Sequence, residues 1–163
     1  MYRFVVYVLL AIGWLAGSAG AAGQPRIALV IGNSDYESAP LKNPENDARL
    51  MASTLRELNF QVWEYQNLGQ KDLKRAMRAF ARELQDAGND AVSLIYYAGH
   101  GIQVDGVNYL VPTDAQIQHE FDVDIEAVSA QSMLQTLKYS NSRLNIVILD
   151  ACRNNPYKRS FRS

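Results

Sequence analysis

The stretch Asn145-Ile-Val-Ile-Leu-Asp150, closely followed by Cys152, is the most informative part of the chain. It is a short continuous apolar run, the pattern of a buried strand in a parallel sheet. A second such run, Val92-Ser-Leu-Ile-Tyr-Tyr97, precedes His100. Because α/β sheets place their chemistry just past the carboxyl ends of parallel strands, we expect His100 and Cys152 to lie at one edge of the sheet.

Apolar strands and amphipathic helices alternate through the rest of the chain. A turn signal, Asp105-Gly106, also predicts a hairpin. The remaining predicted strands lie at residues 26–31 and 60–65, and the predicted helices at residues 43–58, 73–88 and 131–138. This order predicts an α/β fold, a three-layer sandwich around a mainly parallel central sheet with right-handed crossovers.

Length and charge narrow the classes of protein to consider. The chain has 163 residues, enough for one domain, and a formal net charge of −1. It has no run of basic residues, so we expect no nucleic acid partner.

The N-terminal residues have the pattern of a secretory signal peptide. Arg3 precedes an apolar stretch, Phe4 to Leu15, and a segment of small residues follows. We expect a signal peptide at residues 1–21, a domain at residues 22–163, and an exported, periplasmic or secreted protein with no stable membrane span after cleavage. A retained membrane anchor is the alternative, although the apolar stretch is shorter than the ~20 residues that a span needs.

Cys152 and His100 are the types of residue that nucleophilic catalysis uses. A thiolate is a nucleophile, and a nearby imidazole can take the thiol proton or stabilise the thiolate. The backbone N–H groups of Gly101 and Cys152 could form an oxyanion hole, and Gly99 and Gly101 could let a ligand approach closely. From these residues alone, a packed cysteine and an ordinary loop histidine remain the alternative interpretation.

Five ordered motifs resemble those of the caspase-like cysteine peptidases, in the bacterial branch grouped with metacaspases and orthocaspases. The histidine motif is Tyr96-Tyr-Ala-Gly-His-Gly101, and the cysteine motif is Asp150-Ala-Cys-Arg-Asn-Asn-Pro156. The other three are Ala28-Leu-Val-Ile-Gly-Asn33 with Tyr36, the segment 41–48, and the segment 108–115.

The resemblance implies a cysteine-type endopeptidase and assigns its residues. His100 would be the general base or ion-pair partner, Cys152 the nucleophile, and Gly101 with Cys152 the oxyanion donors. Asp150 and Asp47 would line a pocket for arginine or lysine before the scissile bond, where a bidentate contact favours arginine. Alternatively, Asp47 complements the dipole of its helix, and Asp150 bonds to backbone in a turn.

Two departures from the family pattern affect the function. Ala98 stands where metacaspases commonly have a serine that contributes to the specificity pocket. The chain also ends eleven residues after Cys152, whereas caspase-like enzymes continue into a small-subunit segment. An alternative hypothesis is therefore a truncated, non-catalytic caspase-like module with a binding or regulatory role.

The sequence predicts no cofactor and no named metal ligand. The residues after the first strand lack the spaced glycines and lysine of a phosphate-binding loop. Calcium activates some metacaspases, and a cluster of acidic residues here could attract it: Glu120, Asp122, Asp124 and Glu126. The nearby His119 is expected to be a solvated loop residue. The expected partner is a peptide or protein substrate.

Overall fold

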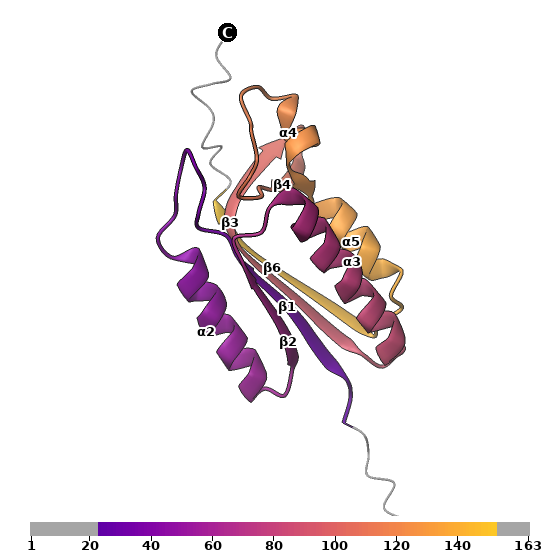
Figure 1. Ribbon diagram of the computed structural model, residues 1–163. Coiled ribbons are helices and arrows are strands. Elements are labelled where there is room, and N and C mark those ends of the chain that lie inside the picture. Colours follow the sequence, from indigo (N-terminus) through magenta and orange to yellow (C-terminus); the bar gives the residue numbers. More distant parts are fainter. Residues whose placement is uncertain (1–22, 153–163) are drawn as a thin grey trace, which may run out of the picture.

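The computed structural model describes residues 23–152, with only the backbone of Cys152, and the predicted signal peptide lies outside them. A six-stranded sheet forms the centre of the molecule, and four parallel strands run in the order β2, β1, β3, β6 (Figure 1). The short strands β4 and β5 extend it antiparallel. The strands are β1 (Arg26–Gly32), β2 (Gln61–Gln66), β3 (Val92–Val104), β4 (Val107–Leu110), β5 (Val128–Ser129) and β6 (Leu144–Cys152).

Helices cover both faces of the parallel sheet. Helix α2 (Pro44–Glu57) lies on one face, and α3 (Gln70–Ala87) and α5 (Ala130–Lys138) lie on the other (Figure 1). A short helix, α4 (Asp122–Glu126), lies beyond the end of the sheet near the β3–β4 hairpin. The predicted three-layer α/β sandwich is therefore confirmed.

Alternation along the strands divides the core between the two faces. On β1, Leu29 packs with Phe80 of α3, whereas the next residue, Val30, packs with Ala52 of α2. Gly32 ends the strand where α2 begins, and a Cβ there would lie 2.5 Å from the carbonyl oxygen of Pro44. Glycine thus lets the N-terminus of α2 approach the sheet closely.

The start of α2 receives a hydrogen-bond partner from another part of the chain. Asn43 is the N-cap residue, and Pro44 is the first helical residue, but the Asn43 side chain makes no capping hydrogen bond. Ser34, in the loop after β1, accepts a hydrogen bond from the N–H of Glu45 at 3.3 Å. A side chain distant in sequence therefore satisfies one N–H group at this helix end.

Strand β3 is longer than the sequence indicated. It spans 13 residues and includes His100, which we had expected in a loop. The strand continues because Gly101 already pairs with Leu110 of the hairpin, so no break separates the parallel and antiparallel regions. The predicted turn is confirmed, with positive φ angles of 48° at Asp105 and 79° at Gly106.

The acidic region forms structure that the sequence did not predict, α4 and the two-residue strand β5. Asp122 accepts hydrogen bonds from the N–H groups of Gln118 and His119, and Asp124 accepts one from Tyr109. Within residues 23–152, no group of three or more His, Cys, Asp or Glu side chains is placed to hold a metal ion. None of the helices described there is long and apolar enough to cross a membrane.

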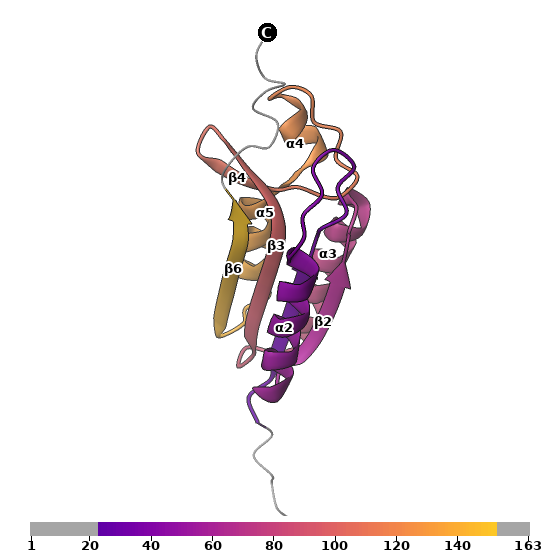
Figure 2. The same ribbon diagram turned by 90° about the vertical axis from the view of Figure 1, so that its left-hand side faces the viewer.

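Strand β6 lies at one side of the sheet. Among the described residues it pairs only with β3, and Figure 2 shows it at the sheet margin. Three of its apolar side chains are partly exposed: Leu144 (50%), Ile148 (37%) and Leu149 (39%). In this part of the chain, β6 therefore offers an unpaired and partly apolar edge.

Candidate active site

The register between β3 and β6 brings His100 and Cys152 together. The two strands run parallel, and His100 is the direct partner of Cys152 in the last pair of the ladder. Partner positions on neighbouring strands lie about 4.8 Å apart. The sequence predicted a shared edge of the sheet, and the structure places the two residues side by side on adjacent strands.

The imidazole of His100 is buried and held by the loop after β1. Its Nε2 lies 2.7 Å from the carbonyl oxygen of Ala39, and its ring centroid is 4.4 Å from that of Tyr36. A carbonyl oxygen can only accept, so Nε2 carries the hydrogen of this bond. In the neutral ring, Nδ1 is then free to accept a proton.

Two tyrosine hydroxyls fix the backbone around His100. The N–H of His100 donates to the Tyr36 hydroxyl at 2.9 Å, and the hydroxyls of Tyr36 and Tyr97 donate to the carbonyl of Val111. Burial, followed by the neighbouring Tyr36, raises the pKa of Tyr97 well above its ordinary value, so this hydroxyl stays protonated. The network holds the histidine segment in one position.

Gly99 provides the space for this network. A Cβ at Gly99 would lie 2.6 Å from the Tyr36 hydroxyl and 2.8 Å from that of Tyr97. We had expected this glycine to let a bound ligand approach, but the groups that approach it are these two hydroxyls.

The backbone of Gly101 is directed toward the end of β6. His100 uses its N–H and its carbonyl on the side of Tyr36 and β4, where Val111 N–H donates to the carbonyl at 3.0 Å. Successive residues of a strand direct their backbone groups to opposite sides. The N–H of Gly101 is therefore directed to the side of β3 on which β6 reaches Cys152, and its role as an oxyanion donor stays a prediction.

Asp47 and Asp150 line the same pocket, which has a volume of about 260 Å³. Asp47 comes from the first turn of α2 and Asp150 from β6, and Ala98 and Gly99 line the pocket between them. Lys42 also contributes to the wall. The two carboxylates that the resemblance singled out thus line one pocket, which also includes Gly99, the residue before His100.

Tyr96 holds the carboxylate of Asp150. Its hydroxyl donates to Asp150 Oδ2 at 3.1 Å. Burial, then the hydrogen bond and charge of Asp150, and also the charge of Asp47, raise the pKa of Tyr96 well above its ordinary value. The hydroxyl therefore remains a donor. The hydrogen bond that the structure gives Asp150 comes from the Tyr96 side chain, whereas the alternative interpretation expected a bond to backbone in a turn.

Sequence reasoning missed several parts of this site. The Ala39 carbonyl has no sequence signal, because every residue type carries one. Tyr36 and Tyr96 were part of the matched motifs, but their roles depend on contacts across 64 and 54 residues. Period-two alternation could have placed Tyr96 on the same face as Ala98 and His100.

The sequence-family model described as the caspase domain matches residues 25–162 of this chain. The chain belongs to the caspase-domain family. The fold of this caspase domain is also similar to the crystal structure of the Drosophila initiator caspase Dronc, with a TM-score of 0.62 at 16% identity, covering 80% of this chain and 50% of that one. The family prediction is confirmed, whereas placement in the metacaspase branch stays a prediction.

Two relatives show the same similarity in sequence. The human mucosa-associated lymphoid tissue lymphoma translocation protein 1 is 33% identical over 131 residues, which is 80% of this chain and 15% of that protein. Caspase a of Danio rerio is 26% identical over 148 residues, or 86% of this chain and 36% of that protein. This caspase domain therefore spans well under half the length of either relative.

Proposed function

We propose that this caspase domain is a cysteine-type endopeptidase that cleaves after arginine or lysine, with Cys152 as the nucleophile and His100 as its base. One observation carries the proposal: the register makes His100 the direct neighbour of Cys152. The bond from Nε2 to Ala39 leaves Nδ1 free to accept the thiol proton. Membership of a family of cysteine peptidases supports this reaction.

The proposed reaction proceeds through an acyl-enzyme. His100 takes the proton of the Cys152 thiol, and the thiolate attacks the carbonyl carbon of the scissile peptide bond. The N–H groups of Gly101 and Cys152 stabilise the negative oxygen of the tetrahedral intermediate. When the C–N bond breaks, His100 protonates the leaving amine, and water then hydrolyses the thioester with His100 again accepting a proton.

The pocket between Asp47 and Asp150 supports the preference for a basic residue. Two carboxylates from different elements line a space next to the reacting residues. A guanidinium can bond to a carboxylate through two parallel N–H groups, which an ammonium cannot do. We therefore expect arginine to be preferred over lysine, and aspartate to be rejected.

Cleavage of three matched fluorogenic peptides, ending in arginine, lysine or aspartate, tests this proposal. The expected order of kcat/KM is arginine, then lysine, with aspartate not cleaved, and Cys152→Ala should abolish all turnover while the circular dichroism spectrum is unchanged. No thiol-dependent cleavage of any peptide would remove the proposed activity for this chain. A preference for aspartate would instead remove only the assignment of the acidic pocket.

A further inference from the structure

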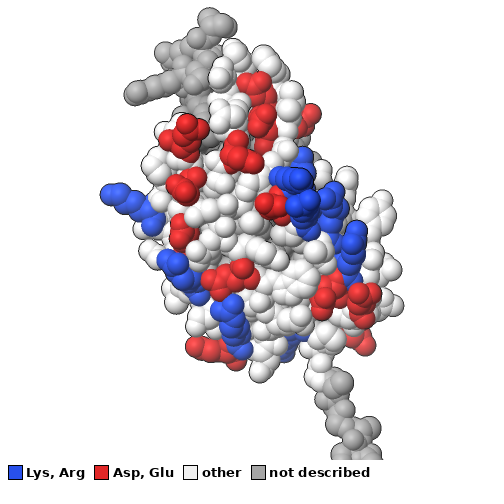
Figure 3. Space-filling model, viewed as in Figure 1, with Lys and Arg blue, Asp and Glu red and all other residues white. Residues whose placement is uncertain are grey.

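Helix α3 presents a stripe of basic side chains on its outer surface. Its buried side, which includes Leu73, Phe80 and Leu84, packs against the sheet. The opposite side carries exposed cations at helical spacing, and Figure 3 shows them gathered over α3 with acidic residues at the margins. We name this surface the α3 stripe: Lys71, Lys74, Arg75, Arg78 and Arg82.

Among the residues that the structure describes, most cations of the α3 stripe have no ion-pair partner. Arg75 pairs with Asp72 at 3.2 Å. Among the ion pairs of residues 23–152, none involves the other four cations of the stripe. The overall charge of −1 had suggested no basic surface, but the helix collects cations that are scattered in the sequence.

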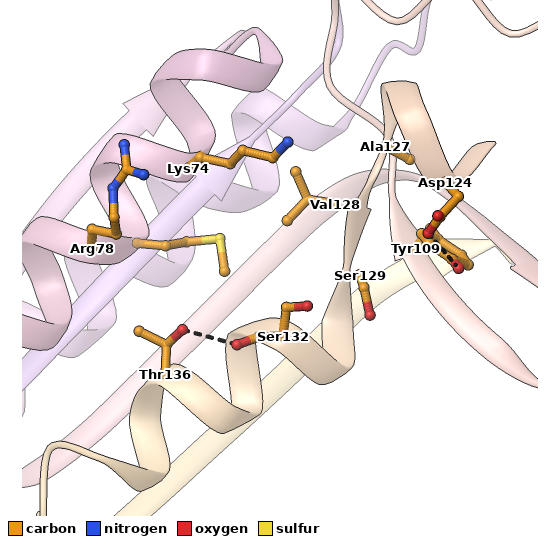
Figure 4. Close-up of a pocket in the computed structure, with 10 residues that line it drawn as sticks. Lys74, Arg78, Tyr109, Asp124, Ala127, Val128, Ser129, Ser132 and Thr136 are labelled. Atoms are coloured by element: carbon orange, nitrogen blue, oxygen red, sulfur yellow. Dashed lines mark hydrogen bonds between the residues drawn. The ribbon is translucent and has the colours of Figure 1, made fainter. Parts of the chain in front are cut away.

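A pocket of about 310 Å³ opens beside the α3 stripe. Lys74 and Arg78 line it from α3, and Ser129 and Ser132 line it from the N-cap and the first turn of α5 (Figure 4). The hydroxyl of Thr136 donates to the carbonyl of Ser132 at 2.9 Å. The pocket therefore combines two cations with two serine hydroxyls.

The far end of the pocket has a different chemistry. Asp124 lines it there and accepts a hydrogen bond from the Tyr109 hydroxyl at 3.2 Å, away from Lys74 and Arg78 (Figure 4). Met77 and Val128 supply apolar lining. This arrangement of cations, apolar surface and one carboxylate suits an acidic peptide. An anionic side chain of the peptide would bind the cations, its aliphatic stem would contact the apolar lining, and a backbone N–H would donate to Asp124.

We propose that the α3 stripe and this pocket bind an extended acidic segment of a partner protein. Lys71 and Arg82 lie eleven positions apart, so the stripe is about 16 Å long. That length matches roughly five residues of extended peptide, and exceeds what a single small anion covers. The carboxylate of Asp124 at the far end of the pocket disfavours the evenly spaced negative charges of a nucleic acid backbone.

This binding goes beyond the proposed proteolysis and lies away from it. The pocket with Asp47 and Asp150 is on the α2 side of the sheet, whereas the α3 stripe lies on the opposite side. The proposed substrate pocket attracts cations, so an acidic peptide would be repelled there. The partner's binding can consequently be measured without any cleavage.

Fluorescence anisotropy of a labelled peptide of alternating Glu and Ser tests the proposal on the full chain with Cys152→Ala. We expect this peptide to bind and a matched peptide of Lys and Ser not to bind. The double charge reversal Lys74→Glu/Arg78→Glu should raise the Kd about tenfold or more, as loss of a charge-assisted contact does. The reversal Arg49→Glu/Arg56→Glu, on the opposite helix α2, makes the same change in net charge and should leave the Kd unchanged.

Four results would overturn the proposal. An equal loss in both double variants would show nonspecific attraction to the whole chain, and absence of binding by the Glu-Ser peptide would remove the site. Tighter binding of duplex DNA or anionic vesicles, lost in the Lys74→Glu/Arg78→Glu variant, would assign the stripe to that class of partner instead. Inorganic phosphate is expected to compete only weakly, and full competition by phosphate would reduce the site to one for a small anion. Circular dichroism of both variants excludes misfolding as the cause.

Discussion

The Tyr96 hydroxyl is positioned to keep the carboxylate of Asp150 directed into the proposed substrate pocket. Tyr96→Phe removes this donor and keeps the ring in the core. The loss of one such hydrogen bond corresponds to a decrease of roughly threefold to tenfold in kcat/KM for an arginine peptide.

The matched variant Asp150→Asn is expected to cause a larger loss, because it removes the charge itself. Separate measurement of KM and kcat distinguishes a role in substrate binding from a role in the chemical step. Substitution of a residue that positions the substrate pocket should raise KM, with little change in kcat. Unchanged KM in Tyr96→Phe would contradict the positioning role.

At the scale of residues, the sequence was informative where chemistry depends on residue type. His100, Cys152, Asp47 and Asp150 were all singled out, and the structure brings His100 next to Cys152 and the two carboxylates into one pocket. The bond between Ala39 and the imidazole could not be predicted, because it depends on the path of a loop backbone.

The β3–β4 hairpin provides a prediction at the scale of elements. Gly106 has a φ of 79°, a region that a residue with a Cβ adopts only at a cost. We expect Gly106→Ala to lower the free energy of unfolding by about 1 kcal/mol in urea denaturation.

Gly23→Ala is the matched control for this variant. A Cβ at Gly23 has nothing within 4 Å, and the residue shows no positive φ. Equal stability of Gly106→Ala and Gly23→Ala would contradict the assigned turn.

The loop that leads into α4 makes a pH-dependent contribution to the stability of the fold. The N–H groups of His119 and Gln118 bond to Asp122, and they lower the pKa of this carboxyl below its ordinary value of 3.8. A lowered pKa stabilises the fold above the unfolded-state pKa, and this contribution is lost as the pH falls through the folded-state pKa. Asp122→Asn should therefore lower the Tm at neutral pH.

The difference in Tm between wild type and Asp122→Asn should shrink as the pH falls below 3.8. Asp72→Asn is a suitable control, because Asp72 is exposed and its ion pair with Arg75 lies on the helix surface. A Tm difference for Asp122→Asn that stays constant down to acid pH would exclude this linkage.

Among the helices and strands, the sequence predicted long elements better than short ones. The apolar periods of α2 and α3 and the runs of β1 and β6 were sufficient to predict those elements. Helix α4 and strand β5 have only five and two residues, too few for a period to appear. Strand β3 was predicted too short because its apolar run ends at Tyr97, whereas the strand continues through Gly99, which makes room for tyrosine hydroxyls.

For the whole molecule, the partly apolar edge of β6 predicts self-association. An unpaired strand edge can pair with another chain. We expect the 163-residue chain to associate as its concentration rises, and Leu144→Lys, which puts a charge on this edge, to reduce the association in sedimentation velocity. Leu50→Lys, at an exposed position of α2 (69%), is the matched control. Equal effects of both variants would contradict a role for the edge.

Strands β3 and β6 place the proposed nucleophile, Cys152, and its proposed base, His100, side by side. The measurement that tests this proposed pair most directly is intact-mass analysis after treatment with a peptide acyloxymethyl ketone that ends in arginine. Cys152 is the only cysteine of the chain, so one adduct in the wild type reports on this thiol. We predict one adduct in the wild type and a strongly slowed reaction in His100→Ala. Equal rates in both proteins, or no adduct in the wild type, would contradict the proposed catalytic pair.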